Sequence, residues 1–369
     1  MNCLAEPDIT LDEWANRMFA PLHKARYPLS ASIELTERCN LNCVHCYINQ
    51  PANCQSAKAR EMSTEQVKFV LDQMAEAGTL FLMITGGEVL LRPDFKDIYL
   101  YAKRLGFIIT VFTNGTMVTP EIADLFAKAR PHLIEITLDG ASAETFEAVT
   151  QVKGSFEQCL KGIRLLAERK LSLYLKTVVL TLNRDELLDI KNLAESLGVP
   201  HRYDGSIWPR LDGSHSPYLH RLSAEETLEM DLADPARAEE WYKTGEKFSG
   251  IPLRRDVAFT CGAGVRSFHV DSAGRLSACM MTRRPSFNLL EMPFAEAWEH
   301  LGEIRRIKRV RSTECEDCLA NDLCNQCPGW SQLEYQDYET PDAFVCILGK
   351  HRLLKFGRIE RLLLEGSYD

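Results

Sequence analysis

The sequence predicts an α/β fold: a partial (β/α)6 barrel followed by a small cysteine-rich C-terminal domain. Apolar strand-like runs alternate with helix-like runs from residue 31 to residue 207, and this alternation is typical of a parallel sheet with helical crossovers. About six strands occur before the pattern ends near Trp208, which is too few for a closed eight-stranded barrel. Seven of the thirteen cysteines then lie between Cys261 and Cys346.

Each repeating unit is assigned from the period of its apolar residues and from its turn and capping residues. Strands are expected over 31–35, 80–85, 108–113, 133–138, 173–180 and 201–207, and helices over 63–77, 94–105, 120–129, 156–169 and 186–197. Further helices are expected over 11–24, 223–244 and 341–365. The second of these begins with a capping box formed by Ser223 and Glu226.

These elements divide the chain into four parts. Residues 1–29 are expected to form an N-terminal helical extension, residues 30–208 the partial barrel, residues 209–255 a connecting helical segment, and residues 256–369 the C-terminal domain with its final helix. The barrel ends where the alternation of strands and helices stops. The C-terminal domain begins shortly before its first cysteine.

The composition indicates a water-soluble cytoplasmic protein. Of the 369 residues, 45% are apolar and 26% are charged, which is enough apolar material for a sizeable core. No stretch approaches the roughly 20 apolar residues of a membrane span, and the N-terminus lacks the layout of a signal peptide. The net charge of −9 argues against non-specific binding to nucleic acid. In a reducing compartment, thirteen cysteines indicate metal binding or catalysis rather than disulfide bonds.

The first group of cysteines directly follows the first expected strand. Cys39, Cys43 and Cys46 have the spacing C-x-x-x-C-x-x-C, which lets three thiolates bind three irons of a [4Fe-4S] cluster and leaves the fourth iron without a protein ligand. Two alternatives are a zinc knuckle with His45 as fourth ligand and a set of buried structural thiols. The loop lies at the carboxyl end of a strand in a β/α sheet, which favours the cluster, because such folds place their sites there.

This segment, with the aromatic Tyr47 after the third cysteine, resembles the signature of the radical S-adenosylmethionine (SAM) superfamily. Three further motifs follow in the order of the strands: Gly86-Gly87-Glu88, Thr113-Asn114-Gly115 and Thr137-Leu138-Asp139-Gly140. Each one alone is also explained by turn chemistry, since Asn-Gly and Asp-Gly supply positive backbone angles. Four motifs at the ends of successive strands are much harder to explain as turns.

The resemblance implies both the cofactors and the reaction. SAM would bind the open iron, and its reductive cleavage would give methionine and a 5′-deoxyadenosyl radical that abstracts hydrogen from a substrate. The residues carried over as SAM-binding are Tyr47, Gly86, Gly87, Glu88, Thr113, Asn114, Thr137, Asp139 and Lys176. Relatives often hold the SAM carboxylate with an arginine where this chain has Ala148 and Thr150. Lys176 or Lys153 is therefore expected to replace that arginine.

The second group of cysteines comprises Cys261, Cys279, Cys315, Cys318, Cys324, Cys327 and Cys346. A zinc ribbon on the two C-x-x-C pairs is one interpretation, but it leaves three cysteines unexplained. The pattern, with Gly274 ahead of Cys279, resembles the SPASM domain, a C-terminal extension of radical SAM enzymes that binds two auxiliary iron-sulfur clusters, expected to be [4Fe-4S].

The SPASM resemblance also implies how these cysteines are shared. An outer cluster would be held by Cys315, Cys318, Cys324 and Cys346, and an inner cluster by Cys261, Cys279 and Cys327. Three ligands leave the inner cluster open or differently completed. The family commonly has three residues between the cysteines that correspond to Cys324 and Cys327, where this chain has only two.

The resemblance implies a radical SAM oxidoreductase that modifies a ribosomally made peptide or a protein side chain, because most SPASM proteins do so by oxidation, epimerisation or cross-linking. The alternatives are a small-molecule or cofactor-biosynthesis oxidoreductase and a non-catalytic zinc-binding interaction protein. Met280 follows Cys279 where sulfatase-maturing relatives have an Asp base, which argues against that activity. The connection from His201 to Asp212 is expected to form the substrate wall, with a solvated loop and an inward-packed Trp208 as the alternative.

The expected partners follow from this assignment. They are a peptide or protein substrate, or a small molecule, and a reductase or flavodoxin- or ferredoxin-type electron donor. Only 38 residues precede Cys39, which is too few for the recognition element of many peptide-modifying relatives. A separate peptide-recognition protein is therefore expected. Neither a nucleic acid nor a membrane is expected as a partner.

Overall fold

The computed structural model describes residues 26–48, 50–246, 256–311, 313–316, 318–320 and 323–357. These residues form a nine-stranded sheet in the order β11-β10-β9-β1-β4-β5-β6-β7-β8 and a two-stranded sheet of β2 (Arg38–Cys39) and β3 (Gln50–Pro51). The strands from β9 to β8 in this order run parallel. The predicted α/β fold class is therefore confirmed.

The predicted alternation of strands and helices is present. The strands are β1 (Ser30–Glu34), β4 (Phe81–Thr85), β5 (Ile108–Thr113), β6 (Leu133–Thr137), β7 (Leu173–Val178) and β8 (His201–Asp204). The helices between them are α3 (Thr64–Glu76), α4 (Phe95–Arg104), α5 (Pro120–Lys128), α7 (Ser155–Glu168) and α8 (Leu187–Ser196). Two short helices between these strands, α2 (Gln55–Arg60) and α6 (Ala143–Thr150), were not predicted from the sequence.

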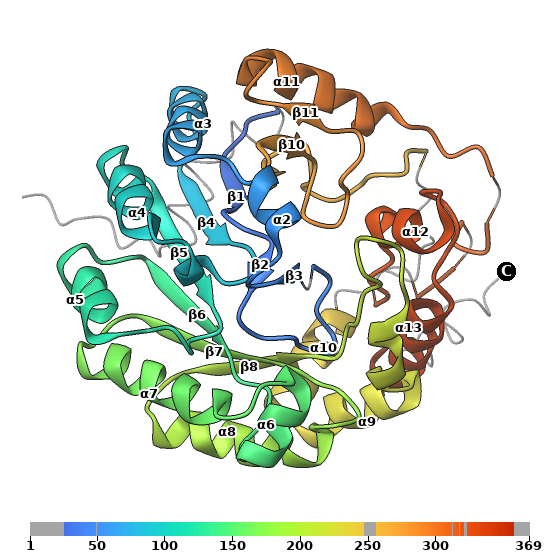
Figure 1. Cartoon of the computed structure of the whole chain (residues 1–369). Helices are drawn as coiled ribbons and strands as arrows, with labels where there is room; N and C mark the ends of the chain where they lie inside the picture. The colour runs from blue at the N-terminus through green and yellow to red at the C-terminus, as the bar shows by residue number, and fades with distance from the viewer. Residues whose placement is uncertain are drawn as a thin grey trace, which may run out of the picture.

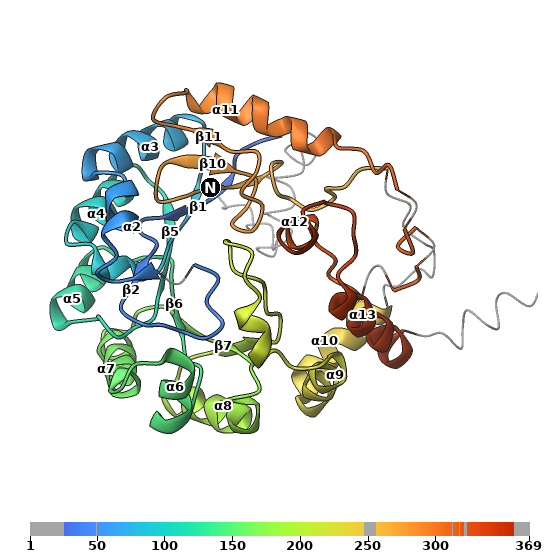
Figure 2. The same ribbon diagram turned by 45° about the vertical axis from the view of Figure 1, so that its right-hand side comes forward.

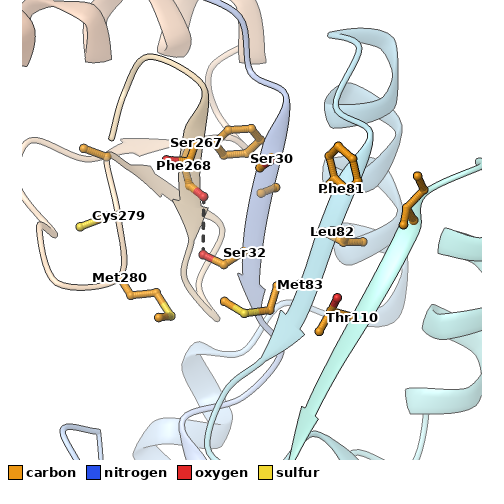
Figure 3. A pocket seen from close by; sticks show the side chains of 13 residues that line it. Ser30, Ser32, Phe81, Leu82, Met83, Thr110, Ser267, Phe268, Cys279 and Met280 are labelled. Atoms are coloured by element: carbon orange, nitrogen blue, oxygen red, sulfur yellow. Dashed lines mark hydrogen bonds between the residues drawn. The ribbon is translucent and has the colours of Figure 1, made fainter. Parts of the chain in front are cut away.

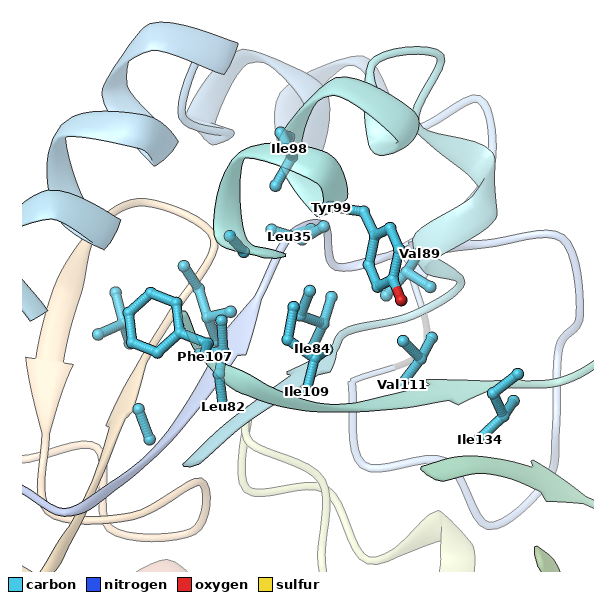
Figure 4. Close-up of a cluster of buried hydrophobic side chains, with 14 of the residues drawn as sticks. Leu35, Leu82, Ile84, Val89, Ile98, Tyr99, Phe107, Ile109, Val111 and Ile134 are labelled. Carbon is cyan, nitrogen blue, oxygen red and sulfur yellow. The ribbon is translucent and has the colours of Figure 1, made fainter. Parts of the chain in front are cut away.

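The main core lies between the strands and the surrounding helices. Side chains alternate along each strand, so that every second residue faces outward. Leu82, Ile84, Ile109 and Val111 face outward, are almost completely buried, and pack near Tyr99 of α4 (Figure 4). The residues between them face the barrel interior and remain available to form a site.

The C-terminal region joins this sheet directly. Strand β9 (Ser267–Val270) pairs in parallel with β1, and β10 (Arg275–Ser277) and β11 (Phe287–Asn288) continue the sheet as antiparallel strands. Figures 1 and 2 show the elements arranged as a ring, with α11 (Phe294–Leu301) beside the new strands. Four helices lie on the other side of the ring from β4 and β5: α9 (Ala224–Ala233), α10 (Pro235–Glu246), α12 (Pro328–Tyr335) and α13 (Ala343–Phe356).

Some expectations differ from the structure or lie outside it. The helix expected over 11–24 falls outside the described residues. The single helix expected over 223–244 is wrong: it is two helices, α9 and α10, with extended backbone at Asp234, because the ring of Pro235 disfavours helical backbone at the residue before it. The predicted capping box of Ser223 and Glu226 is present.

The predicted boundaries between the four parts of the chain stay predictions. The boundary expected before residue 256 assigns β9 to the C-terminal domain, yet this strand pairs with β1 of the barrel. The C-terminal domain therefore contributes strands to the barrel sheet. Within the described ranges, every helix is too short or too polar to span a bilayer.

Gly162 of α7 packs against the turn after β5. A Cβ atom on Gly162 would lie 2.1 Å from the carbonyl oxygen of Gly115, so the contact leaves no room for a side chain. We expect Gly162→Ala to lower the free energy of unfolding by about 1–3 kcal/mol, although alanine is the better helix former. Lys161→Ala, at an exposed position of the same helix, should change it by less than about 0.5 kcal/mol. Anaerobic urea unfolding measures both, and unchanged stability of Gly162→Ala would contradict this packing.

Candidate functional site

A cavity of about 250 Å³ lies at the carboxyl ends of the barrel strands, beneath the loop that follows β1. It brings together most of the residues that the sequence analysis selected: Cys39, Cys43, Cys46, Tyr47, Gly86, Gly87, Thr113, Asn114, Thr137, Asp139 and Lys176. Glu88 is not among the residues that line it. Residues that the sequence analysis did not select also line it, among them Phe112, Phe146 and Met280.

The three cysteines of the loop line this cavity and are partly buried. Burial raises the pKa of the Cys39 thiol to about 12 and the pKa of Cys43 well above its ordinary value. A bound iron would displace these protons, because thiolates are the metal ligands. The side-chain amide of Asn114 and the backbone N–H of Leu41 donate to Cys39 Sγ over 3.6 and 3.4 Å, and such bonds stabilise a thiolate. This donor set fits an iron-sulfur cluster.

The turn Gly86-Gly87-Glu88 packs on the segment that leads into the cysteine loop. Gly87 N donates to Thr36 O over 2.8 Å, and Glu88 N donates to Arg38 O over 2.9 Å. A Cβ atom on Gly86 would lie 2.3 Å from Thr36 O, and one on Gly87 would lie 2.2 Å from Arg38 O. Both glycines are therefore needed for this close contact between two segments, and both also line the cavity.

The Glu88 carboxylate connects the ends of β4 and β5. It is completely buried and accepts hydrogen bonds from Thr113 Oγ1 (2.8 Å), Asn114 N (2.8 Å) and Leu90 N (3.0 Å). Burial raises the pKa of Glu88 above its ordinary value. Through these partners, the side chain holds the ends of β4 and β5 together. Its contact with the amino group of SAM stays a prediction.

Asp139 and His45 place two unpaired polar atoms at the cavity. His45 Nε2 lies 3.7 Å from Asp139 Oδ2, and neither Asp139 Oδ2 nor His45 Nδ1 has a hydrogen-bond partner among the described residues. Burial raises the pKa of Asp139 to about 7 and lowers the pKa of His45 to about 4. The imidazole is thus neutral at pH 7. Since buried polar atoms rarely stay unpaired, these atoms fit a cavity that takes a polar ligand.

The two lysines considered for the SAM carboxylate lie in different places. Lys176 lines the cavity, and its Nζ lies 4.0 Å from the centre of the Phe112 ring. Burial lowers the pKa of Lys176. Lys153, in contrast, is exposed and does not line the cavity. Of the two, Lys176 is therefore better placed, and its role stays a prediction.

The three cysteines of the predicted inner group lie near one another. Burial, with the nearby Cys279 and Cys261, raises the pKa of the Cys327 thiol to about 11. Cys279 and Met280 also line a second cavity of about 300 Å³ on the inner faces of β1, β4, β5 and β9 (Figure 3). Met280 lines both cavities. It therefore lies between the cavity at the cysteine loop, hereafter the SAM cavity, and Cys279 of the predicted inner group.

Three of the four cysteines of the predicted outer group, Cys315, Cys324 and Cys346, lie near one another. Cys315 and Cys346 share a hydrogen bond, which lowers the pKa of Cys315 and raises the pKa of Cys346. The nearby Cys324 raises the pKa of Cys346 further. Cys318 is partly buried. Among the described residues, no three His, Cys, Asp or Glu side chains surround a point at the distances of a single metal ion. Cluster binding by either group stays a prediction.

A buried ion pair of Glu34 and Arg283 beside the cavity was not predicted from the sequence. Glu34 Oε1 accepts from Arg283 Nη2 over 2.6 Å, and Glu34 Oε2 accepts from Nη1 over 3.1 Å. Burial acts to raise the pKa of Glu34, but His269 and Arg283 outweigh it and hold this pKa at about 2. The only signal in the sequence was a charged residue between Ile33 and Leu35 in a strand that is otherwise uncharged.

The connection expected to form the substrate wall is largely packed. Trp208 packs against Trp330 of α12, with ring centres 4.2 Å apart and ring planes tilted by 36°, so Trp208 is packed inward as the alternative interpretation expected. His201 Nε2 lies 2.8 Å from Thr177 Oγ1. Thr177 follows Lys176, which lines the cavity, so the side chains of Thr177 and His201 lie on the opposite face of the sheet. Further along, Leu211 N donates to Tyr47 O over 3.0 Å, which brings the connection against the cysteine loop.

Known proteins resemble this chain over most of its length. Residues 33–194 match the model of the radical SAM superfamily. The chain is 28% identical over 336 residues to an AdoMet-dependent (SAM-dependent) heme synthase of Methanosarcina barkeri, covering 83% of this chain and 92% of that protein. It is 29% identical over 309 residues to the mycofactocin maturase MftC of Mycolicibacterium smegmatis, covering 80% and 77%. It is 28% identical over 303 residues to the subtilosin biosynthesis protein AlbA of Bacillus subtilis, covering 82% and 65%.

Solved structures share the fold. SuiB of Streptococcus suis, bound to S-adenosylmethionine, has a TM-score of 0.66 at 15% identity and covers 94% of this chain and 83% of its own. The protein anSMEcpe with bound AdoMet also has a TM-score of 0.66 at 15% identity, covering 91% and 98%. Since residues 33–194 match the superfamily model and the superfamily motifs meet in one cavity, this part of the chain is a radical SAM domain, and a cysteine-rich C-terminal region follows it.

Proposed function

We propose that this chain is a radical SAM enzyme that modifies a side chain of a ribosomally made peptide or of a protein, by oxidation, epimerisation or cross-linking. One observation carries the proposal. A single cavity gathers the three thiols of the cysteine loop, the Gly86-Gly87 turn and Met280, which directly follows Cys279 of the second cysteine group. The cofactor site and the C-terminal region therefore meet at one place.

The match of residues 33–194 to the radical SAM superfamily implies a [4Fe-4S] cluster and SAM. The residues proposed to hold the cluster are Cys39, Cys43 and Cys46, which are partly buried and line the cavity. When bound, the cluster and SAM together supply the one-electron cleavage of SAM that starts hydrogen abstraction from a substrate. Two auxiliary clusters are proposed on the two groups of C-terminal cysteines, the inner on Cys261, Cys279 and Cys327 and the outer on Cys315, Cys318, Cys324 and Cys346.

The chain's own residues would orient the ligand and exclude water. Phe112, Phe146 and Met280 give the cavity apolar walls, which protect a reactive site from side reactions with water. Asp139 Oδ2 is an unpaired acceptor there, and Lys176 supplies a buried cation for a carboxylate. Asn114 stabilises one cysteine thiolate by its side-chain amide.

Relatives support a peptide substrate. MftC and AlbA are named as a maturase and as a bacteriocin biosynthesis protein, and SuiB has been solved with its precursor peptide bound, at a TM-score of 0.66. Our proposal transfers only the substrate class from these proteins. A flavodoxin- or ferredoxin-type donor or a reductase is proposed as the electron source, and a separate recognition protein as a partner for the peptide. The proposed location is the cytoplasm.

A second candidate function is the modification of a porphyrin-type heme precursor. The observation that favours it is the similarity to the heme synthase of Methanosarcina barkeri, which extends over 92% of that protein. The second cavity is compatible with either substrate class, because its described lining residues carry no charged side chain. The substrate experiment below separates the two candidates.

The cysteine loop provides the first test. We expect Cys43→Ala to lower the iron content by about four atoms per chain after anaerobic reconstitution and to abolish formation of 5′-deoxyadenosine from SAM and a reductant. The control is Cys54→Ser, because Cys54 precedes α2 and does not line the cavity; it should keep both properties. Metal analysis accompanies the assay. Stoichiometric zinc in the wild-type chain, with no 5′-deoxyadenosine, would instead support a zinc-binding interaction protein.

The two lysines give a second, matched test. Lys176→Met should weaken SAM binding by about 10- to 100-fold, because a hydrogen bond to a charged group contributes about 1.5–3 kcal/mol. Lys153→Met should leave the affinity unchanged, since this lysine is exposed outside the cavity. The measurement is a SAM titration followed by the electron paramagnetic resonance (EPR) signal of the reduced cluster. The opposite ranking of the two variants would move the carboxylate contact to Lys153.

The third test addresses the substrate. The reconstituted enzyme is incubated with SAM, a reductant and either peptides encoded near its gene or a heme-precursor porphyrin, and the products are analysed by mass spectrometry. We expect a mass change in a peptide, and none with the Cys43→Ala variant. A mass change in the porphyrin, with no peptide altered, would reverse the ranking of the two candidates.

A further inference from the structure

The ion pair of Glu34 and Arg283 joins the first barrel strand to the segment that follows Cys279. The two nitrogens at the end of the guanidinium donate to the two carboxylate oxygens, over 2.6 and 3.1 Å. Such a two-pronged contact fixes orientation as well as distance. The side chains are 1% and 20% exposed, so water competes little for these bonds.

The same guanidinium also holds its own segment. Arg283 Nε donates to the carbonyl oxygen of Met280, so one side chain connects Glu34 with the backbone of Met280. The hydroxyl of Tyr47 donates to Glu34 Oε1 over 3.3 Å and lies 3.8 Å from Met280 Sδ. Because Tyr47 directly follows Cys46, the position of Met280 depends on both the first strand and the cysteine loop.

The surroundings of Glu34 indicate that the pair does more than attach β9 to the sheet. His269 of β9 is fully buried, with Nδ1 2.8 Å from Ser32 Oγ and Nε2 3.7 Å from Glu34 Oε2. Backbone pairing already holds β9 beside β1 over four residues. A buried ion pair often stabilises a fold no more than an apolar pair of similar volume. Its distinctive property is the fixed orientation that it gives to its neighbours.

We propose that Glu34 and Arg283 are positioning residues, which fix Met280 as the wall between the SAM cavity and the second cavity. This inference rests on the proposed function, since it concerns how the substrate side is placed relative to SAM. Met280 is the residue that lines both cavities, and it stands next to a predicted ligand of the inner cluster. Displacing it would open one cavity to the other and admit water beside the cofactor.

The test compares variants that separate charge, geometry and stability. Arg283→Lys keeps the charge but loses the two-pronged contact. The double variant Glu34→Gln with Arg283→Met removes both charges and leaves no unpaired buried ion. The control is Arg352→Lys, because Arg352 donates to Asp231 over 2.7 and 3.1 Å in another buried pair, between α13 and α9, and neither residue lines either cavity.

The first measurement follows Met280 directly and does not depend on activity. The 369-residue chain, reconstituted and oxidised, is labelled with 13C in its methionine methyl groups, and Met280→Leu identifies the signal of Met280 among the ten methionines. We expect this signal to shift or broaden in Arg283→Lys and in the double variant, but not in Arg352→Lys. An unchanged Met280 signal in both test variants would overturn the proposal.

The second measurement combines thermal unfolding with SAM affinity, read from the EPR signal of the reduced cluster. Arg283→Lys and Arg352→Lys should unfold at similarly lowered temperatures, and the double variant should regain part of the loss. SAM affinity should fall about tenfold in Arg283→Lys and in the double variant and stay at the wild-type value in Arg352→Lys. A purely structural role predicts that affinity follows the unfolding temperature instead.

The two measurements also separate this inference from the proposed function. If SAM leaves the wild-type EPR signal unperturbed, the proposed function fails, while the methyl signal still decides whether the ion pair positions Met280. If SAM perturbs the wild-type signal but Arg283→Lys behaves like Arg352→Lys in both measurements, the positioning role fails alone.

Discussion

The central position of β1 is the constraint on which the arrangement of the site depends. This strand pairs in parallel with β4 on one side and with β9 on the other. The cysteine loop leaves its carboxyl end. Strand β10 pairs antiparallel with β9 and leads to Cys279 and Met280. This pairing brings Met280 to the cavity that the cysteine loop also lines. The cavity, Met280 and the ion pair of Glu34 and Arg283 all lie at this junction.

Close backbone contact at this edge leaves little freedom for the sequence. The Gly86-Gly87 turn fits against residues 36–38 only because glycine has no Cβ atom. A Cβ atom on either residue would meet a carbonyl oxygen. The carboxylate of Glu88 then fastens this turn to the end of β5. The motif thus has a structural role in shaping the cavity wall, in addition to any contact with a ligand. A motif match alone does not distinguish these roles.

The sequence by itself determined the elements of the barrel and the chemistry of its site. Periodic apolar residues and local caps, such as Ser63 with Gln66 before α3, depend on near neighbours, so the predicted strands and helices are present with small differences at their ends. The spacing of Cys39, Cys43 and Cys46 and the motifs after β4, β5 and β6 likewise depend on short segments. Most of the residues chosen on this basis line one cavity. The break at Pro235 was also visible in the sequence and was overlooked.

Only the tertiary structure decided which distant segments meet. The pairing of β9 with β1, the bond from Arg283 to Glu34 across 249 positions and the place of Met280 in two cavities leave no periodic or local signal, because they depend on how the chain returns to its first strand. The choice between Lys176 and Lys153 was open for the same reason. A lysine becomes a candidate ligand through the burial and direction of its side chain, and both are set by packing rather than by adjacent residues.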